Sequence, residues 1–306
     1  MVNPMTKRDY GWLVSLPFFG VHAAAIIGVA LLGWSWKWFG IAMALYYVRM
    51  FGVTGGYHRY FSHRTYRTGR AFQLFLAVLA QTSIQKGALW WAAHHRDHHK
   101  FSDTKQDPHS WREYGFWYSH IGWIVSRRTE DTHWKNIKDL ERYPELRWLN
   151  TWHAVPGLVM AILCYVVGGM HGLVWGFFVS TTLLWHGTFT INSLSHWWGG
   201  RRYDTADDSK NNFVLALVTM GEGWHNNHHY YPRSTAQGFL WWQVDPTLYI
   251  LKGLSKVGLV WDLQLPPQAV LDGTLVAPRE KGKVTTLPVA LVSSPSSVAV
   301  TEAAAE

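Results

Sequence analysis

The histidines are the residues of this chain whose spacing points most directly to chemistry. The sequence holds 17 histidines among 306 residues, and the imidazole nitrogen is a common ligand of transition metals. Four short segments, HRYFSH, HRDHH, NSLSH and HNNHH, contain nine of them. Nine imidazoles are more than one ion binds, so the pattern predicts two ions. The nine are His58, His63, His95, His98, His99, His196, His225, His228 and His229.

The number and type of these ligands also bear on which metal they hold. Zinc sites are normally complete with four ligands. Nine imidazoles suit two ions of higher coordination number that keep a position for dioxygen or water. We expect iron, because only a redox metal can use dioxygen, although nitrogen ligands by themselves do not exclude copper. A solvated helix face can carry one such cluster, but four clusters in compatible positions argue against that interpretation.

The spacing within each cluster predicts how its rings converge. His95, His98 and His99 occupy positions i, i+3 and i+4, which share one face of a helix, so their rings can meet at one ion or bridge a close pair. HNNHH has the same spacing. The side chains of His58 and His63, at i and i+5, are roughly 140° apart on a regular helix. These two rings therefore need a bend or a helix end between them.

The rest of the sequence supplies elements that can hold the clusters at one membrane face. Four apolar segments are long enough to cross a bilayer, which takes about 20 residues. They form two hairpins with short connections, and basic residues gather at the opposite end. The positive-inside rule then places both termini and all four clusters in the cytoplasm, in a bacterial-type cytoplasmic membrane. The predicted spans are 11–33, 37–55, 153–174 and 176–195.

A fifth apolar segment, 71–93, contains Gln73, Gln81 and Lys86. If it crossed the membrane, the histidines before and after it would lie on opposite sides, so we expect a helix on the cytoplasmic side or at the membrane surface. The predicted fold is an all-α membrane protein, with four transmembrane helices and a cytoplasmic helical cap in one domain over 1–265. Residues 266–306 are rich in Pro, Ser, Ala and Val without clear periodicity, and we expect a disordered tail.

Composition narrows the classes of partner. The chain carries 20 tryptophans, a residue that concentrates at membrane interfaces. Its formal charge of +8 fits anionic lipid headgroups or a phosphorylated substrate carrier. It contains no nucleic-acid motif, so we expect no nucleic-acid partner. The single cysteine, Cys164, excludes a disulfide framework within the chain.

The histidine segments in their sequence context indicate a family. HRYFSH, HRDHHKFSDTKQDPH, NSLSH and GEGWHNNHH resemble the membrane fatty acyl desaturases, in particular the acyl-CoA Δ9 (stearoyl-CoA-like) branch, over about residues 10–265. The resemblance implies a di-iron centre held by the nine histidines, with Asn192 holding a water. It also implies dioxygen as co-substrate and a kinked apolar tunnel for the acyl chain. The implied reaction puts a cis double bond into a saturated acyl-CoA in unsaturated fatty acid biosynthesis.

The resemblance also implies a substrate carrier and an electron donor. Arginine and asparagine hold the CoA group in animal relatives, but the corresponding region here reads KGALWWAAHH. We expect Lys86, Arg127 and Arg128 to contact the carrier phosphates instead, and an acyl group on a glycerolipid remains an open alternative. The chain has no haem-binding HPGG, so the expected donor is a separate protein, such as ferredoxin or cytochrome b5 with its reductase.

Other polar residues near the clusters are candidates to orient the imidazoles. We expect this role for Asp97, Asp103, Asp107, His109 and Glu222. The nearest alternative function is a fatty acyl hydroxylase, because the same iron chemistry can end in oxygen insertion. A non-catalytic membrane metal-binding protein is a further alternative, although it would carry ionisable ligands along a path within the spans. A haem-binding electron carrier would not need nine clustered imidazoles.

Overall fold

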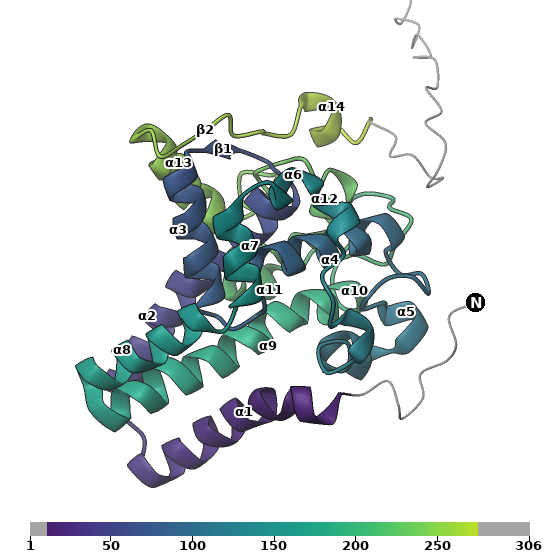
Figure 1. Cartoon of the computed structure of the whole chain (residues 1–306). Coiled ribbons are helices and arrows are strands. Elements are labelled where there is room, and N and C mark those ends of the chain that lie inside the picture. The colour runs from purple at the N-terminus through teal and green to yellow at the C-terminus, as the bar shows by residue number, and fades with distance from the viewer. Residues whose placement is uncertain (1–10, 275–306) are drawn as a thin grey trace, which may run out of the picture.

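Helices form nearly all the regular structure of residues 11–274, the part of the chain that this computed structural model describes (Figure 1). The one strand pair within that part is short and antiparallel, and it joins β1 (Arg67–Thr68) to β2 (Val260–Trp261). The prediction of a mainly helical chain is confirmed. The helices are α1 (Trp12–Leu32), α2 (Trp36–Phe51), η2 (Gly52–Ser62), α3 (Arg70–Gln81), α4 (Ala88–Phe101), α5 (Trp111–Tyr114), η3 (Tyr118–Gly122), η4 (Arg127–Thr129), η5 (Trp134–Asn136), α6 (Lys138–Glu141), α7 (Pro144–Thr151), α8 (Val155–His171), η6 (Gly172–Val179), α9 (Ser180–Asn192), α10 (Leu194–Trp197), α11 (Phe213–Val218), α12 (His225–Tyr230), α13 (Pro246–Lys256) and α14 (Gln268–Leu271).

Two long helical hairpins carry the apolar segments. In the first, α1 ends at Gly33, whose φ of 78° suits glycine, and the Ser35 side chain accepts a hydrogen bond from the Trp38 N–H at the start of α2. In the second, α8 turns into η6 and α9 near Gly169, whose φ is 58°. Both turns lie at the same end of the molecule, at the lower left in Figure 1.

The outer sides of these hairpins suit a lipid environment. Ser15–Leu32 and Val155–Trp197 are apolar and long enough to cross a membrane. The second stretch runs through both arms of its hairpin, and Leu31 and Val167 are 80% and 86% exposed. The α-helical part of α2 has only 16 residues before it continues as a π-helix. The arrangement of four spans therefore stays a prediction.

The segment 71–93 differs from the prediction of one helix. It forms α3 and α4, separated by a turn in which Ile84 and Lys86 have positive φ. Leu76 and Ala80 of α3 are fully buried in the main hydrophobic core, and Gln81 Nε2 donates to the Leu149 carbonyl over 2.8 Å. The polar side chain of Gln81 therefore links α3 to α7 by a hydrogen bond.

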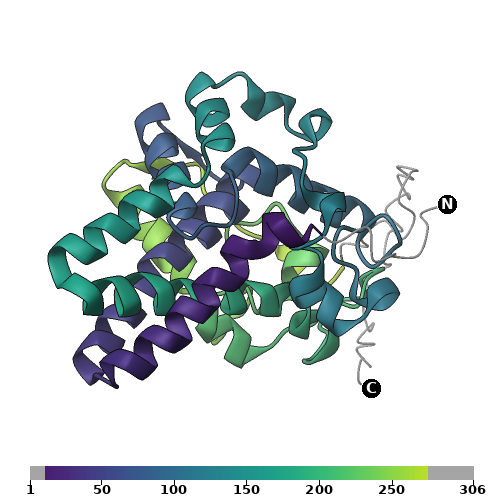
Figure 2. The same ribbon diagram turned by 60° about the horizontal axis from the view of Figure 1, so that its bottom comes forward.

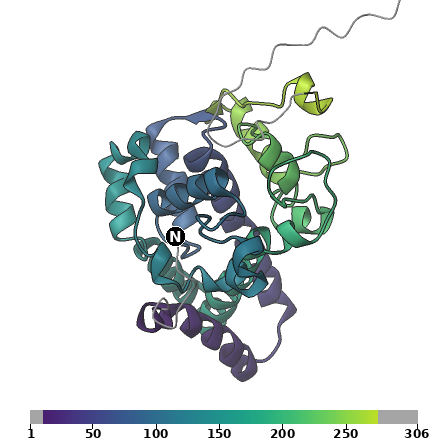
Figure 3. The same cartoon turned by 90° about the vertical axis from the view of Figure 1, so that its right-hand side faces the viewer.

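The packed part of the chain continues beyond residue 265. Val270 in α14 is completely buried, in a small cluster with Tyr203 and Tyr230. Gln268–Leu271, within the predicted disordered tail, are therefore helical, and residues 275–306 lie outside the described residues, as do residues 1–10. Figures 2 and 3 show α1 at the outside of the helix group, on the side away from α13 and α14.

Candidate metal centre

A π-helix aligns the first pair of histidines. In η2 the backbone bonds run from i+5 to i, and the His63 N–H bonds to the His58 carbonyl over 3.2 Å. One turn of this wider helix therefore separates the two residues, and their ring centroids are 4.9 Å apart. The expected helix end is present, because η2 stops at Ser62. No sharp bend is required, because positions i and i+5 lie on nearly the same side of a π-helix, whereas they are roughly 140° apart on an α-helix.

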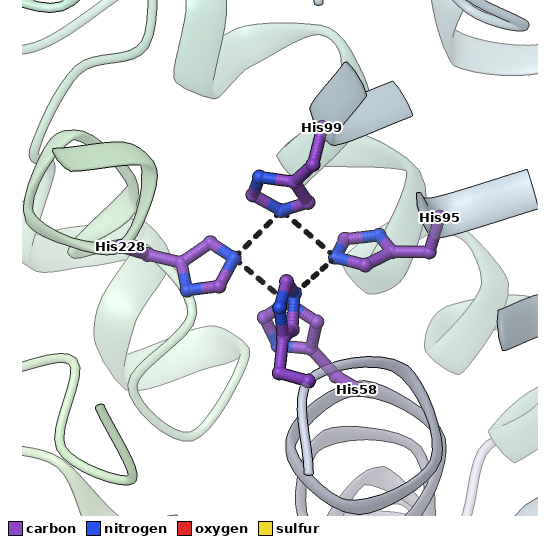
Figure 4. A group of neighbouring side chains, drawn as sticks. His58, His95, His99 and His228 are labelled. Atoms are coloured by element: carbon purple, nitrogen blue, oxygen red, sulfur yellow. Dashed lines mark hydrogen bonds between the residues drawn. The ribbon is translucent and has the colours of Figure 1, made fainter. Parts of the chain in front are cut away.

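The other clusters divide their rings between two sites. In α4, His95 and His99 face one group while His98 faces the other; in α12, His228 joins the first group. Figure 4 shows four rings of the first group pointing at one common centre from three separate segments. Ligand atoms within each group lie within 4.8 Å of one another. The first group is His58, His63, His95, His99 and His228, and the second is His98, His196, His225 and His229.

The spacing of the nitrogens fits a metal ion. Two imidazole nitrogens bound at right angles to an ion at about 2.1 Å are about 3.0 Å apart. In the first group, the Nε2 atoms of His95 and His99 are 3.0 Å apart, and those of His99 and His228 are 2.9 Å apart. In the second group, the Nε2 atoms of His196 and His225 are 3.1 Å apart. The arrangement therefore offers two adjacent sites, each with an all-imidazole donor set.

Carboxylates behind the rings fix which nitrogen faces the centre. Asp107 lies 3.0 Å from His98 Nδ1, Asp103 lies 3.0 Å from His196 Nδ1, and Glu222 contacts His58 Nδ1. Each carboxylate accepts a hydrogen bond from the Nδ1–H group, so the Nε2 lone pair points inward, as metal-binding histidines require. The structure thus places these three carboxylates, which the sequence analysis singled out, beside three of the nine histidines.

Two further aspartates differ from the sequence prediction. Asp97 does not face the rings, because its carboxylate lies 2.6 Å from Nδ1 of the exposed His133. Its predicted orienting role is therefore wrong in this structure. Asp207, which the sequence analysis missed, takes that role for His229 at 2.8 Å. Asp207 lies in the loop between the NSLSH and HNNHH segments and belongs to neither, so the spacing of the histidines offered no signal for it.

His109 and Gln237 complete the surroundings. His109 packs its ring against His98, with centroids 4.2 Å apart, and its backbone N–H donates to Asp107 Oδ1 over 3.1 Å. It forms a third, smaller group with His98 and Asp107. Gln237 Nε2 lies 3.1 Å from His58 Nδ1 and donates to Glu222. Gln237 was another residue that the sequence did not reveal.

Burial sets the protonation of the centre. Desolvation, followed by the charge of neighbouring rings, lowers the pKa of His95, His99 and His228 well below its usual value. These rings are therefore neutral near pH 7 and can bind a cation. Burial opposes ionisation of Asp103, but the hydrogen bond to His196 and its charge, together with the Asp208 backbone N–H and the charge of His98, outweigh that effect and lower the pKa of Asp103 to about 2. The carboxylate thus stays charged.

A cavity reaches the first group of histidines at His95. It has a volume of about 580 Å³, within the range of about 300–1,000 Å³ typical of small-molecule sites. Phe18, Trp185 and Phe189 contribute to its apolar lining, and Asn192 and His95 lie at its metal end. Asn192 also lines a small cavity of about 40 Å³, together with His58 and His95 of the first group and His98 and His225 of the second. This cavity is large enough for a water.

Two of the three residues that were predicted to contact the substrate carrier line this cavity. Lys86 and Arg127 are among its lining residues, together with Glu130. Desolvation lowers the pKa of Lys86, partly offset by Glu130 and Asp131. Arg128 is not among the described residues that line the cavity, so the structure does not place it with the other two.

Comparison with known proteins identifies the family of this arrangement. The profile of the fatty acid desaturase family matches residues 34–256. The chain belongs to this family. It is 36% identical over 270 residues to an sn-2 palmitoyl-lipid 9-desaturase from Nostoc sp., covering 85% of this chain and 93% of the relative. It is also 37% identical over 253 residues to an acyl-CoA C20 Delta5-desaturase from Anemone leveillei, covering 81% and 80%.

A third relative is the sn-1 stearoyl-lipid 9-desaturase of Synechocystis sp., 34% identical over 270 residues, covering 87% of this chain and 84% of that one. Membership of the fatty acid desaturase family supports desaturase activity in lipid metabolism and an acyl or lipid substrate. It agrees with histidine groups able to hold metal and with helices apolar enough to span a membrane. The relatives differ in carrier and in double-bond position.

Proposed function

We propose that this fatty acid desaturase family member is a dioxygen-dependent enzyme that introduces a cis double bond at Δ9 of a saturated acyl chain. The observation that carries the proposal is an apolar cavity that reaches His95 of one all-histidine group and shares Asn192 with a small cavity lined by rings of both groups. Two of the three relatives described above carry a 9-desaturase name, which supports the Δ9 position. A hydroxylase would share the same site, so its product is an explicit outcome of the test below.

The nine histidines would hold two iron ions, and Asn192 would hold a water beside the second. Bound iron supplies the redox chemistry by which dioxygen oxidises unactivated methylenes. One hydrogen leaves each of two adjacent methylenes, and two external electrons and two protons complete the conversion of dioxygen to two waters. Asp103, Asp107, Asp207 and Glu222 keep the Nε2 atoms directed at the ions by holding the Nδ1 protons of their histidines.

The cavity wall decides which methylenes react. All methylenes of an alkyl chain are chemically alike, so position must come from how the chain is held. Trp91 stacks on His95, with centroids 4.9 Å apart, and lines the cavity beside the first group. Phe18 and Trp185 stack at 5.0 Å further along the wall. This aromatic lining positions the acyl chain and excludes water.

Two carriers fit the polar part of the cavity. Lys86 and Arg127 favour an anionic carrier, and we propose acyl-CoA as the first candidate. An acyl lipid is the second candidate, favoured by the lipid-desaturase names of two relatives. We further propose four spans with both termini and the metal centre in the cytoplasm. The electrons would come from a separate ferredoxin or cytochrome b5 with its reductase.

Product analysis tests the proposal. The chain would be produced in cells that lack an aerobic desaturase and contain a competent donor, with double bonds located by mass spectrometry. We expect a new cis-Δ9 monounsaturated acid that disappears in His98→Ala. The matched control is His133→Ala, which removes an exposed histidine paired with Asp97 and should retain the product.

Other products would change the proposal. A hydroxylated chain would favour the hydroxylase, and a double bond at another position would reject Δ9. No change in the lipids, with folded and iron-loaded protein, would reject the acyl desaturase. Assays of purified protein with acyl-CoA and with acyl lipid in bilayers would separate the two carriers.

A further inference from the structure

Three histidines outside the metal centre form a hydrogen-bonded chain across three elements. His22 Nε2 in α1 lies 3.1 Å from His186 Nε2 in α9. His186 Nδ1 lies 3.0 Å from Nε2 of His120 in η3. The chain ends at Ser193 Oγ, 2.9 Å from His120 Nδ1. None of these three histidines belongs to the nine of the metal centre, although Ser193 lies in the NSLSH segment that carries Asn192 and His196.

The ends of the chain determine its direction. His22 Nδ1 lies 2.8 Å from the Phe18 carbonyl, which only accepts, so that nitrogen carries the proton. With neutral rings, His186 Nε2 must then donate to His22, and His120 Nε2 must donate to His186. The Ser193 hydroxyl donates to His120 Nδ1, although its oxygen also lies 3.0 Å from the Phe189 carbonyl. Every ring nitrogen is satisfied in this one arrangement.

The chain adjoins the aromatic wall of the acyl cavity. Phe18 lies one helical turn before His22, and its ring stacks on Trp185, the residue next to His186. Phe189 lies beside both His186 and His120, with centroid distances of 5.9 and 5.8 Å. Phe18, Trp185 and Phe189 all line the cavity. The polar chain therefore fastens the two helices that supply this wall.

α1 is also held by apolar packing against η6, where a Cβ atom on Gly28 would lie 2.6 Å from a methyl carbon of Val174. It lies at the outside of the helix group (Figure 2), and its outward side chains such as Ile26 and Leu31 are 72% and 80% exposed. Because lipid tails are as apolar as the helix, no hydrophobic driving force holds α1 to the bundle, and interhelical hydrogen bonds act together with close packing. A directional hydrogen bond between His22 and His186 fixes the height of α1 relative to α9.

We propose that His22 and His186, with His120 holding the tautomer of His186, are positioning residues that set which methylene pair reaches the metal centre. The inference rests on the proposed desaturase function. Loss of the link between His22 and His186 frees the Phe18 side of the wall to shift along α9. The acyl chain then settles at more than one depth, and double bonds form at neighbouring positions.

Four variants test this role in the host used for product analysis. His186→Leu removes both links. His186→Asn can keep an acceptor for His120 but loses the donor to His22, whereas His186→Gln can keep the donor to His22. His22→Leu removes the α1 end alone. We expect a severalfold rise in minor positional isomers for the Leu and Asn variants, and a pattern close to the wild type for His186→Gln.

The matched control is His171→Leu, which removes a histidine stacked on Trp38 at the far turn of the second hairpin. It should leave the isomer pattern unchanged. Thermal unfolding and iron content would be measured for every variant, because a loss of stability alone lowers yield without changing double-bond position. If His186→Leu misfolds, His22→Leu and His186→Asn still decide the question.

Two results would overturn the inference while leaving the desaturase proposal intact. One is a wild-type isomer pattern in folded His22→Leu and His186→Asn. The other is an equal shift in His171→Leu. Absence of any unsaturated product from the wild-type protein would instead count against the proposed function itself.

Discussion

At the scale of single residues, the orientation of each histidine ring depends on the group that its Nδ1 atom contacts. Three of the four carboxylates that accept hydrogen bonds from Nδ1–H groups, Asp103, Asp107 and Asp207, come from two loops, one following α4 and one following α10. Asp103 links the two loops, because its Oδ2 accepts from His196 and from the Asp208 backbone N–H over 2.7 Å. The orientation of a ring in one element is thus set by a loop from another.

Asp207→Asn should weaken metal binding. The asparagine amide oxygen accepts a weaker hydrogen bond from His229 Nδ1–H than the carboxylate does. Loss of such a partner typically costs about 10–100-fold in metal affinity. Chelator competition on purified protein would measure this change. Asp97→Asn is the matched control, because Asp97 pairs with exposed His133 instead of a ring of the centre. Equal losses in the two variants would contradict the assignment of Asp207.

At the scale of elements, the centre depends on close packing of η2 against α3. Gly52 begins η2 where it crosses α3, and a Cβ atom there would lie 2.8 Å from the Ala80 nitrogen and 3.0 Å from the Leu79 carbonyl carbon. These are backbone atoms, so a side chain cannot be accommodated by a rotamer change. The glycine permits the approach that holds His58 and His63 in register with α4.

Gly52→Ala should therefore destabilise the protein. Overpacking of this kind typically costs about 1–3 kcal/mol, and we expect a lower thermal unfolding midpoint and reduced iron loading in the same detergent. Gly40→Ala is the matched control in α2, where a Cβ meets nothing within 4 Å. Alanine is the better helix former by about 1 kcal/mol, so that variant should be at least as stable as the wild type. A Gly52→Ala midpoint at or above that of Gly40→Ala would refute the packing argument.

The sequence revealed the histidines more completely than the elements that carry them. The nine rings do converge, because each cluster has a spacing that a helix turns into a common face. The π-helix over Gly52–Ser62 was not predicted, since its backbone pattern has no residue signature like that of an α-helix. The break between α3 and α4 was also missed, because KGALWW continues the apolar run and the turn depends on tertiary contacts such as Gln81 with α7. Asp207 could be found only in three dimensions.

At the scale of the whole molecule, the hairpin turns and the metal centre lie at opposite ends. The turns at Gly33 and Gly169 are at the lower left in Figure 1, whereas α4, α10 and α12, which carry seven of the nine histidines, lie toward the upper right. Membrane insertion along the hairpins would therefore put the turns on one side and the centre on the other. The predicted orientation places the centre in the cytoplasm.

Thiol labelling can test that orientation, because the chain has a single cysteine, Cys164. In a Cys164→Ser background, Lys37→Cys lies near the first turn, and Lys138→Cys lies at the start of α6; both lysines are exposed. A membrane-impermeant maleimide added to intact cells should label Lys37→Cys alone. Lysed cells should show labelling of both. Labelling of only Lys138→Cys in intact cells would reverse the orientation, and labelling of both would contradict the spans.

The division of each His-x-x-His-His segment between two groups has a consequence for how the centre fills. α4 supplies two rings to the first group and one to the second, and α12 supplies one to the first and two to the second. An ion bound by one group holds α4 and α12 in place, and this also positions the rings that these helices contribute to the other group. Occupancy of the two positions should therefore be positively coupled. Preparations with an average of one ion per chain should then be mixtures of empty and fully loaded molecules.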